Sequence, residues 1–329
     1  MSRNSEARYK LKSRYFEELK ETSLAVDPFV DNFIKNYLDI SNEIKLGVLE
    51  RYRFKKPKLR PAQVRFAYEL AGGLDWKKVI PLCGAIELKD TSYYCADDVF
   101  DKNENSKTMY IVGNLLSVIA NSMINEMEQL VNSKEKFSKI YKSVFTLDSQ
   151  IYQGFYIDEN MKGTGEEYYM KKAYAYNYWE HILKMAALTT NADDIVVNNI
   201  SEIGKNIGIA YTIANDTCDF GKPNLEDFAT GKYTLPIIFA MNNISETAKE
   251  KLNRLIGKGE LVDADKEVVR KIIVQSGAIK YGKSKAWEFC EKALLILKDF
   301  PNSKAKEMLE FSTTMTQRNK YYDVLNRYI

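Results

Sequence analysis

Apolar residues recur at intervals of three and four positions along almost the whole chain, which is the periodicity of one buried face of an α-helix. Only 7 prolines and 16 glycines interrupt the 329 residues, and most of these breakers fall between the periodic stretches. The pattern therefore predicts an all-α protein. The expected helices span residues 5–22, 27–52, 62–71, 76–101, 110–132, 136–158, 165–189, 194–218, 234–241, 245–256, 265–276, 278–298 and 303–328.

The stretches between these helices are short, and none has the length of a linker between domains. No internal repeat of fixed period is visible either. We therefore expect a single domain over residues 1–329, with residues 1–29 as an N-terminal helical extension and residues 321–329 as a C-terminal extension. The expected loops are residues 55–61, 102–107, 160–165 and 220–232.

The charge of the chain is nearly balanced, with 48 Lys and Arg against 45 Asp and Glu and a net charge of +3. This balance predicts no long-range attraction to nucleic acid or to a membrane surface. The first 20 residues are charged, and no apolar run reaches the roughly 20 residues that a membrane-spanning helix needs. We therefore expect a cytoplasmic protein with no nucleic-acid partner and no membrane insertion.

Cysteine and histidine offer little chemistry. The four cysteines, Cys83, Cys95, Cys218 and Cys290, are far apart, so their spacing predicts neither a disulfide framework nor a zinc site. His181 is the single histidine of the sequence. Mechanisms that need a Ser-His or Cys-His pair, or several imidazole ligands, are therefore disfavoured.

Three aspartates, Asp97, Asp98 and Asp101, form a DDxxD pattern at the end of an apolar predicted helix. Spacings of three and four residues put these carboxylates on one helical face, where they can share a ligand. Mg²⁺ prefers a few carboxylates together with the phosphate oxygens of a substrate. A diphosphate bound through Mg²⁺ is therefore the expected ligand.

A second cluster, Asn215, Asp216 and Asp219, repeats this geometry on another predicted helix, with Asn in place of the first Asp. Either cluster alone is more typical of a solvated helix end than of a metal site, because such short motifs often mislead. Two clusters, each following a run of apolar and small residues, weaken that alternative. We expect both to bind Mg²⁺, and the Asn-Asp pair also resembles the metal ligands of terpene cyclases.

The positive charge of metal ions bound at the two clusters predicts the type of reaction. Metal ions that neutralise a leaving diphosphate between the two clusters allow an allylic carbon–oxygen bond to ionise without a nucleophilic side chain or a base. The resulting carbocation needs a dry pocket lined by aromatic rings. Candidate linings are Tyr93, Tyr94 and Phe66, although each of them is equally compatible with ordinary packing in the core.

The first Asp-rich region of trans-isoprenyl diphosphate synthases resembles residues 84–101, GAIELKDTSYYCADDVFD. The second motif of that family and its following loop are similar to residues 204–219, GKNIGIAYTIANDTCD, and 221–237, GKPNLEDFATGKYTLPI. Order and spacing agree over about residues 30 to 320. Weaker matches are LRPAQ at 59–63, GAIKY at 277–281 and QRNK at 317–320.

The resemblance implies about a dozen helices around a central cavity, usually in a homodimer, and an allylic prenyl diphosphate as substrate. Mg²⁺ would be held by the two clusters, whose five aspartates would be the catalytic residues. On that plan Lys232 contacts the allylic diphosphate, which needs cations as well as metal. Arg60 and Lys107 are further expected substrate-binding residues.

Members of the family that elongate chains bind isopentenyl diphosphate in a basic pocket, and much of that pocket is changed here. Pro57 replaces the lysine of the basic loop, although Lys56 and Lys58 flank it. Asp90 stands where His or Gln is expected and adds a negative charge that would repel an anionic co-substrate. The remaining changes are Ser106 and Lys107 at the usual Arg pair and Tyr174-Ala175 at the usual Lys-Thr.

These changes favour ionisation of one allylic prenyl diphosphate, followed by cyclisation, as in terpene synthases, or by transfer to a non-standard acceptor. Ser92 leaves more room near the first cluster than a second aromatic ring would, and a C15 or C20 substrate is our working assumption. Two alternatives stay open. One is a geranyl, farnesyl or geranylgeranyl diphosphate synthase that uses isopentenyl diphosphate, and the other is an inactive subunit that regulates an active synthase.

Overall fold

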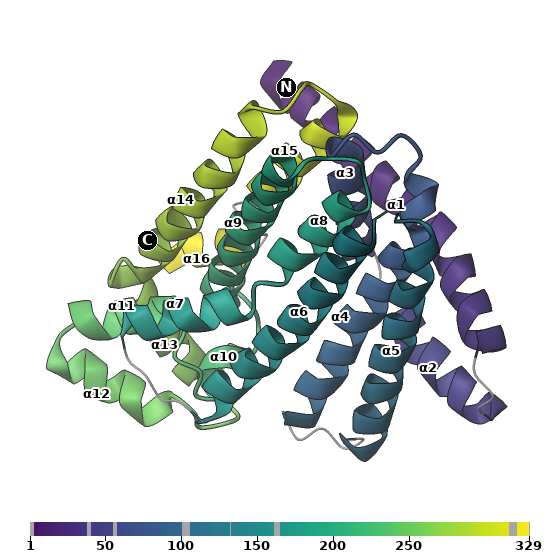
Figure 1. Cartoon of the computed structure of the whole chain (residues 1–329). Coiled ribbons are helices and arrows are strands. Elements are labelled where there is room, and N and C mark those ends of the chain that lie inside the picture. The colour runs from purple at the N-terminus through teal and green to yellow at the C-terminus, as the bar shows by residue number, and fades with distance from the viewer. Residues whose placement is uncertain are drawn as a thin grey trace. The chain divides into compact units, whose positions relative to one another are not determined.

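The computed structural model describes residues 3–37, 41–54, 58–100, 106–131, 133–160, 165–315 and 321–328, and every regular element within these ranges is a helix (Figure 1). The predicted all-α class is confirmed. The α-helices are α1 (Arg3–Tyr37), α2 (Asn42–Phe54), α3 (Leu59–Leu70), α4 (Ile80–Phe100), α5 (Ser106–Glu126), α6 (Lys134–Asn160), α7 (Glu166–Ala175), α8 (Tyr178–Leu188), α9 (Asp194–Asp219), α10 (Glu226–Ala229), α11 (Leu235–Asn243), α12 (Glu246–Leu255), α13 (Asp263–Gln275), α14 (Ala278–Lys298), α15 (Lys304–Met315) and α16 (Tyr321–Leu325). Short 3-10 helices are η1 (Trp76–Val79), η2 (Met127–Gln129) and η3 (Asn326–Tyr328).

The helices group into two compact units. In the first unit α4 and α5 lie side by side, and α1 and α3 pack against α4. In the second unit α11 packs on α14, and α13 contacts both. The expected single domain stays a prediction. The first unit comprises Met1–Thr146, Glu180–Gly204 and Phe300–Phe311, and the second comprises Leu147–Trp179, Lys205–Asp299 and Ser312–Ile329.

Helix α1 is longer than predicted, because it continues through the expected break between residues 22 and 27. Pro28 lies inside it and costs about 3 kcal/mol relative to a good helix former. Each fully buried aliphatic side chain contributes about 1.5 to 3 kcal/mol, so the apolar face on both sides of Pro28 outweighs that cost. The buried side chains of α1 follow one another at intervals of three or four residues and are Tyr15, Leu19, Thr22, Val26, Val30 and Ile34.

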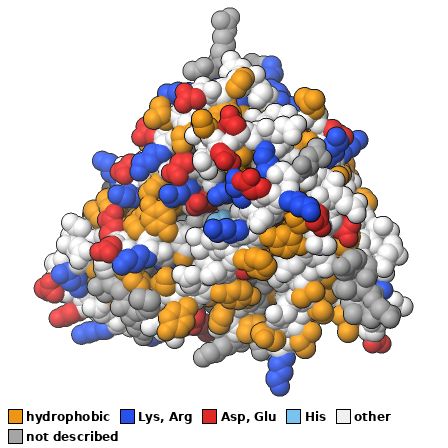
Figure 2. Space-filling model, viewed as in Figure 1, with side chains coloured by type: hydrophobic (Ala, Val, Ile, Leu, Met, Phe, Trp, Pro, Cys, Tyr) orange, Lys and Arg blue, Asp and Glu red, His pale blue; other side chains and the backbone are white. Residues whose placement is uncertain are grey.

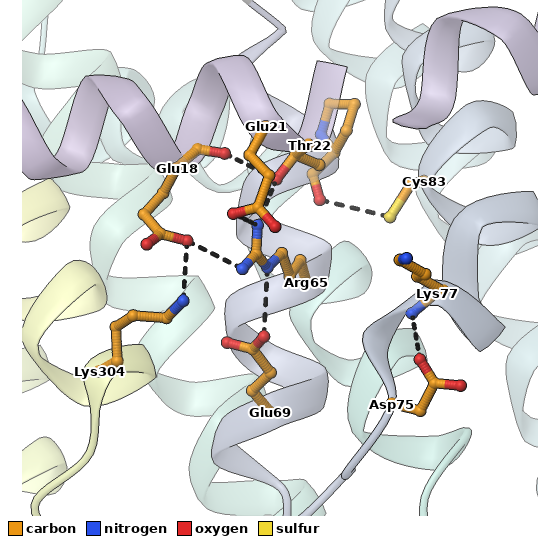
Figure 3. Close-up of polar contacts among 10 residues, drawn as sticks. Glu18, Glu21, Thr22, Arg65, Glu69, Asp75, Lys77, Cys83 and Lys304 are labelled. Carbon is orange, nitrogen blue, oxygen red and sulfur yellow. Dashed lines mark hydrogen bonds and ion pairs between the residues drawn. The ribbon is translucent and has the colours of Figure 1, made fainter. Parts of the chain in front are cut away.

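Within the first unit, ion pairs of Arg65 in α3 connect α3 to α1 (Figure 3). Its side chain is 2% exposed, and its guanidinium nitrogens lie 2.8 Å from Glu18, 3.1 Å from Glu21 and 3.1 Å from Glu69. Lys304, in the first turn of α15, contacts the same Glu18 oxygen at 3.0 Å. Residues 1–29, expected as an extension, therefore contribute to the packed interior of this unit.

Other elements also differ from the prediction. The helix expected over residues 27–52 falls partly in α1 and partly in α2, and the one expected over residues 303–328 is divided into α15, α16 and η3. The helix expected over residues 165–189 is divided at Tyr176 and Asn177 into α7 and α8. The Asn177 side chain is buried there and donates a hydrogen bond to the Lys205 carbonyl oxygen at 3.0 Å, which favours a turn over a continuous helix. The loop expected over residues 220–232 contains the short helix α10.

The second unit has an apolar core beneath the C-terminal end of α9. One part of it joins Ile209 and Ile213 of α9 to Leu235 of α11 and to Phe289 of α14.

On the outside, Figure 2 shows acidic and basic side chains intermixed over one face, in keeping with the small net charge. Among the described residues, no helix is both long enough and apolar enough to cross a membrane.

Candidate active site

The first aspartate cluster lies at the C-terminal end of α4. Asp97 and Asp98 occupy the last turn and are half-buried, whereas Asp101 lies outside the described residues. Unpaired carbonyl groups make a helix C-terminus electrically negative, so two carboxylates there raise the electrostatic energy. Arg51 of α2 offsets part of this charge by donating a hydrogen bond to Asp98 Oδ2. A cluster of this kind is predisposed to bind cations.

Helix α5 approaches α4 closely beside this cluster. A Cβ atom on Gly113 would lie 2.8 Å from the Cβ of Cys95, so only glycine fits at this contact. One turn before Asp97, Tyr93 is buried and Tyr94 is 41% exposed. Phe66, the third candidate lining, is fully buried against the ring of Tyr15, so its placement fits the packing alternative.

The residues of the expected basic loop are engaged with acids of the same unit. Arg60 Nε lies 3.3 Å from Oδ1 of Asp90, and both side chains are buried or nearly so. Lys58 is fully buried, with its Nζ 3.5 Å from Glu87 Oε1 and donating to the Tyr52 carbonyl oxygen at 3.0 Å. Of the other expected positions, Lys107 is exposed at the start of α5, and Lys56, Pro57 and the side chain of Ser106 lie outside the described residues.

The second cluster lies at the C-terminal end of α9, in a different setting. Asp216 and Asp219 are buried, whereas Asn215 is exposed. Oδ2 of Asp216 accepts a hydrogen bond from the Tyr169 hydroxyl at 2.9 Å. Oδ1 of Asp219 accepts no hydrogen bond but lies 3.2 Å from Nζ of Lys222. The two carboxylates therefore depend on few partners for compensation of their charge.

A buried lysine beside this cluster was not among the predicted site residues. Lys172 of α7 is 5% exposed, and its Nζ contacts Oδ1 of Asp158 at 2.7 Å. Although burial works against its charged form, the neighbouring carboxylates of Asp216 and Asp158 raise the pKa of Lys172. It lies two positions before Tyr174, which replaces the family's usual lysine. The adjacent lysines Lys171 and Lys172 were the feature of the sequence that could have pointed to it.

Burial determines the protonation of the second cluster. Desolvation raises the pKa of Asp216 to about 7, against the opposing effect of Lys172. Desolvation and the charge of Asp227 raise the pKa of Asp219 to about 6, although Lys222 opposes this. A bound divalent cation would hold both groups ionised at neutral pH. The buried oxygens of this cluster therefore fit a metal ion.

Each cluster offers two carboxylates among the described residues, Asp97 and Asp98 in the first and Asp216 and Asp219 in the second. In the part of the chain that the structure describes, no three Asp, Glu, His or Cys side chains are grouped closely enough to hold a metal ion. Mg²⁺ commonly takes one or two carboxylates and completes its coordination with water and substrate phosphates. The donor set of each cluster fits that mode of binding.

The loop after α9 is fixed by hydrogen bonds to the second cluster and to α13. The Asp227 backbone N–H donates to Asp219 Oδ2 at 3.3 Å. Arg270 of α13 donates to the carbonyl oxygens of Phe220 and Lys222 at 3.0 and 2.7 Å. Lys232 lies at the end of this loop with a half-buried side chain, and its backbone N–H donates to the Asp227 carbonyl oxygen at 2.8 Å.

Comparison with known proteins identifies sequence relatives. The family model described as polyprenyl synthetase matches residues 55–273. A geranylfarnesyl diphosphate synthase from Aeropyrum pernix is 26% identical over 308 residues, which cover 85% of this chain and 96% of that protein. A probable mitochondrial hexaprenyl pyrophosphate synthase from Neurospora crassa is 25% identical over 258 residues, covering 71% of this chain but only 56% of that protein.

Comparison with solved structures supports the same fold. The geranylgeranyl pyrophosphate synthetase of Pyrococcus horikoshii Ot3 superposes with a TM-score of 0.82, covering 94% of this chain and 99% of that one. Its sequence identity is 22%, so this likeness establishes the fold and not the reaction.

Proposed function

The chain belongs to the polyprenyl synthetase family, and on that basis we propose that it is a chain-elongating prenyl diphosphate synthase. Such an enzyme joins an allylic prenyl diphosphate to isopentenyl diphosphate and releases diphosphate. The family match confirms the resemblance stated from the sequence, and with it the prediction of an enzyme of the isoprenoid synthase class. Elongation was one of the two alternatives to the terpene-synthase or non-standard-acceptor activity that the sequence favoured.

The names of the relatives support elongation over cyclisation. The Aeropyrum and Neurospora proteins are named as synthases of geranylfarnesyl diphosphate and hexaprenyl pyrophosphate, and neither name describes a cyclase. The terpene-synthase activity that the changed basic pocket suggested has no such support. Elongation is therefore the leading proposal, and the length of the product is left to experiment.

One structural observation carries the proposed chemistry, namely that both aspartate clusters occupy the negative ends of helices. Asp97 and Asp98 end α4, and Asp216 and Asp219 end α9. Cations stabilise a helix C-terminus, so helix stability does not account for carboxylates at these positions. Carboxylates there favour a function that brings cations with the substrate.

The chain's own residues would then act on the diphosphate. Mg²⁺ bound by aspartate carboxylates of this kind would neutralise the leaving group and so lower the barrier to ionisation. Lys232 and Lys107 would bind phosphate oxygens, and Lys172 would hold Asp216 in place for its ligand. The allylic carbon–oxygen bond breaks with its electron pair on the diphosphate. The double bond of isopentenyl diphosphate then forms the new carbon–carbon bond, and a proton is lost.

A second candidate function is favoured by the state of the basic loop. Arg60 is already paired with Asp90, and Lys58 is buried against Glu87, so neither side chain is presented to a second diphosphate in this structure. Breaking the Arg60–Asp90 pair to bind a co-substrate would leave a buried carboxylate, which is costly. This observation favours ionisation of a single prenyl diphosphate or transfer to a neutral acceptor.

Product analysis separates the two candidates. Purified protein with Mg²⁺ is incubated with geranyl, farnesyl or geranylgeranyl diphosphate, each with and without isopentenyl diphosphate. Elongation predicts a longer prenyl diphosphate only when both substrates are present. A hydrocarbon or alcohol formed from the allylic substrate alone would refute elongation as the main activity and support the second candidate.

Variants test the site independently of the product. Asp98→Ala is expected to abolish turnover under either candidate, because the first cluster would lose a ligand. Retained activity would remove the metal mechanism. If the wild-type chain turns over none of these substrates, the result would support the remaining alternative, an inactive subunit that regulates an active synthase. The homodimer, Mg²⁺ as the metal and a cytoplasmic location stay predictions.

A further inference from the structure

Arg51, near the end of α2, directs its guanidinium at the first aspartate cluster. Its Nη2 donates a hydrogen bond to Oδ2 of Asp98, which lies 47 residues later in the chain. The Arg51 side chain is 21% exposed and the Asp98 side chain 32% exposed. Unlike the buried network around Arg65, this ion pair can therefore be reached from solvent.

The pair contributes little to the stability of the fold. Water screens a partly exposed ion pair, and holding two side chains in one geometry costs conformational entropy. Asp98 needs a cation for another reason, because it lies beside Asp97 at the negative end of α4. The position of Arg51 therefore matters chiefly for the charge of the cluster.

A guanidinium at this place is suited to bind phosphate. Its five N–H donors form a planar fork that matches the oxygens of a diphosphate, and the bond from Nη2 to Asp98 holds this fork at the cluster. The cation at the start of α5, Lys107, is an exposed ammonium group on a flexible stem and lacks that geometry. The described part of α2 thus supplies a fork-shaped donor at the first cluster.

We propose that Arg51 binds the diphosphate group of the allylic substrate at the first aspartate cluster. Its N–H groups would take up negative charge that moves onto the phosphate oxygens as the carbon–oxygen bond breaks. This inference rests on the proposed function and adds to it a residue outside both Asp-rich segments and the basic loop.

Arg53 provides a matched control on the same helix. Two residues correspond to a rotation of about 200° around a helix, so Arg53 faces away from Arg51. It pairs instead with Asp31 of α1, with Nε 3.2 Å from Oδ1, and its side chain is 51% exposed. Loss of Arg53 removes one positive charge from α2 without touching the first cluster.

The test is a calorimetric titration of inorganic diphosphate in the presence of Mg²⁺ into the wild-type chain and the variants R51Q, R51K and R53Q. Charge-assisted hydrogen bonds are strong, so R51Q is expected to bind at least about 10-fold more weakly than wild type. R51K should lie between R51Q and wild type, because it keeps the charge without the fork. R53Q should bind within about twofold of wild type.

Diphosphate binding by R51Q that equals or exceeds wild type would overturn the inference, since Arg51 would then only neutralise Asp98. A weakening of the same size in R53Q would also overturn it, because net charge alone would account for the effect. If R51Q does not give a folded circular-dichroism spectrum, the comparison of R51K with wild type decides in the same way. Absence of Mg²⁺-dependent diphosphate binding in the wild type would instead refute the proposed function itself.

Discussion

Gly282 of α14 lies against Thr217, in the middle of the second aspartate cluster. A Cβ atom at position 282 would overlap Oγ1 of Thr217 and would lie 3.0 Å from Cγ2 and 3.2 Å from Cβ of that residue. Thr217 is fully buried, and its hydroxyl donates to the Ile213 carbonyl oxygen at 2.6 Å. Gly282→Ala would therefore press directly on the segment of α9 that carries Asp216 and Asp219.

The net effect on stability follows from three contributions. Overpacking a filled core costs about 1 to 3 kcal/mol. Rotating Thr217 away breaks its bond to Ile213, worth about 1 kcal/mol, and brings no full relief because Cγ2 and Cβ are also close. Alanine gains about 1 kcal/mol over glycine in a helix. Gly282→Ala should therefore lower the free energy of unfolding by about 2 kcal/mol.

The assay is urea unfolding followed by circular dichroism for G282A, T217A and the double variant. Removing the Thr217 side chain beyond Cβ makes room for the new methyl group, so the double mutant should recover at least about 1 kcal/mol of coupling energy. Gly47→Ala is the control, because nothing lies within 4 Å of its Cβ position in α2. It should stabilise by about 0.5 to 1 kcal/mol. A G282A chain as stable as G47A would refute the close packing of α9 and α14.

Two further predictions concern the first unit. Arg65→Met should cost about 1.5 to 3 kcal/mol in urea unfolding, because it removes the charged hydrogen-bond partner of Glu18 and Glu69, whose side chains are 16% and 20% exposed. Arg14→Met, which removes an exposed pair with Glu307 at 3.1 Å, should cost less than about 1 kcal/mol, and equal effects would refute the burial argument. Burial and the charge of Lys184 lower the pKa of His181 from 6.5 to about 4. The unfolded chain therefore binds a proton that the folded chain does not, and stability should fall by about 3 kcal/mol as the pH falls from 6.5 to 4. The difference in unfolding free energy between wild type and His181→Gln should therefore shift against wild type by about 3 kcal/mol over this range, and parallel curves would contradict the assignment.

The sequence predicted the helical class and the position of both aspartate clusters because these depend on local patterns. Apolar periodicity identifies helices without knowledge of their partners, and DDxxD spacing defines a helical face. The break expected near residue 23 was wrong for the opposite reason. Continuity through Pro28 depends on the burial of Val26 and Val30, which only the packing of α1 decides.

The cations around the clusters were harder to predict. Lys172 of α7 contacts Asp158 of α6, and Arg51 of α2 contacts Asp98 of α4. Such contacts depend on tertiary packing and leave no spacing in the sequence. Counting basic residues only at the family's usual positions therefore missed one cation beside each cluster. The assignment of the individual site residues stays a prediction.

The anchoring of α1 also has a consequence for the order of events during synthesis. Glu18 leaves the ribosome 286 residues before its partner Lys304. At about 5 to 20 residues per second, that interval lasts about 15 to 60 s. The contact between the rings of Tyr15 and Phe311, whose centroids are 5.0 Å apart in the folded chain, likewise cannot form until Phe311 has been synthesised. Helix α1 can pack on α3 and α4 early in synthesis, but the part of its apolar face around Tyr15 completes its contacts only after α15 has been made.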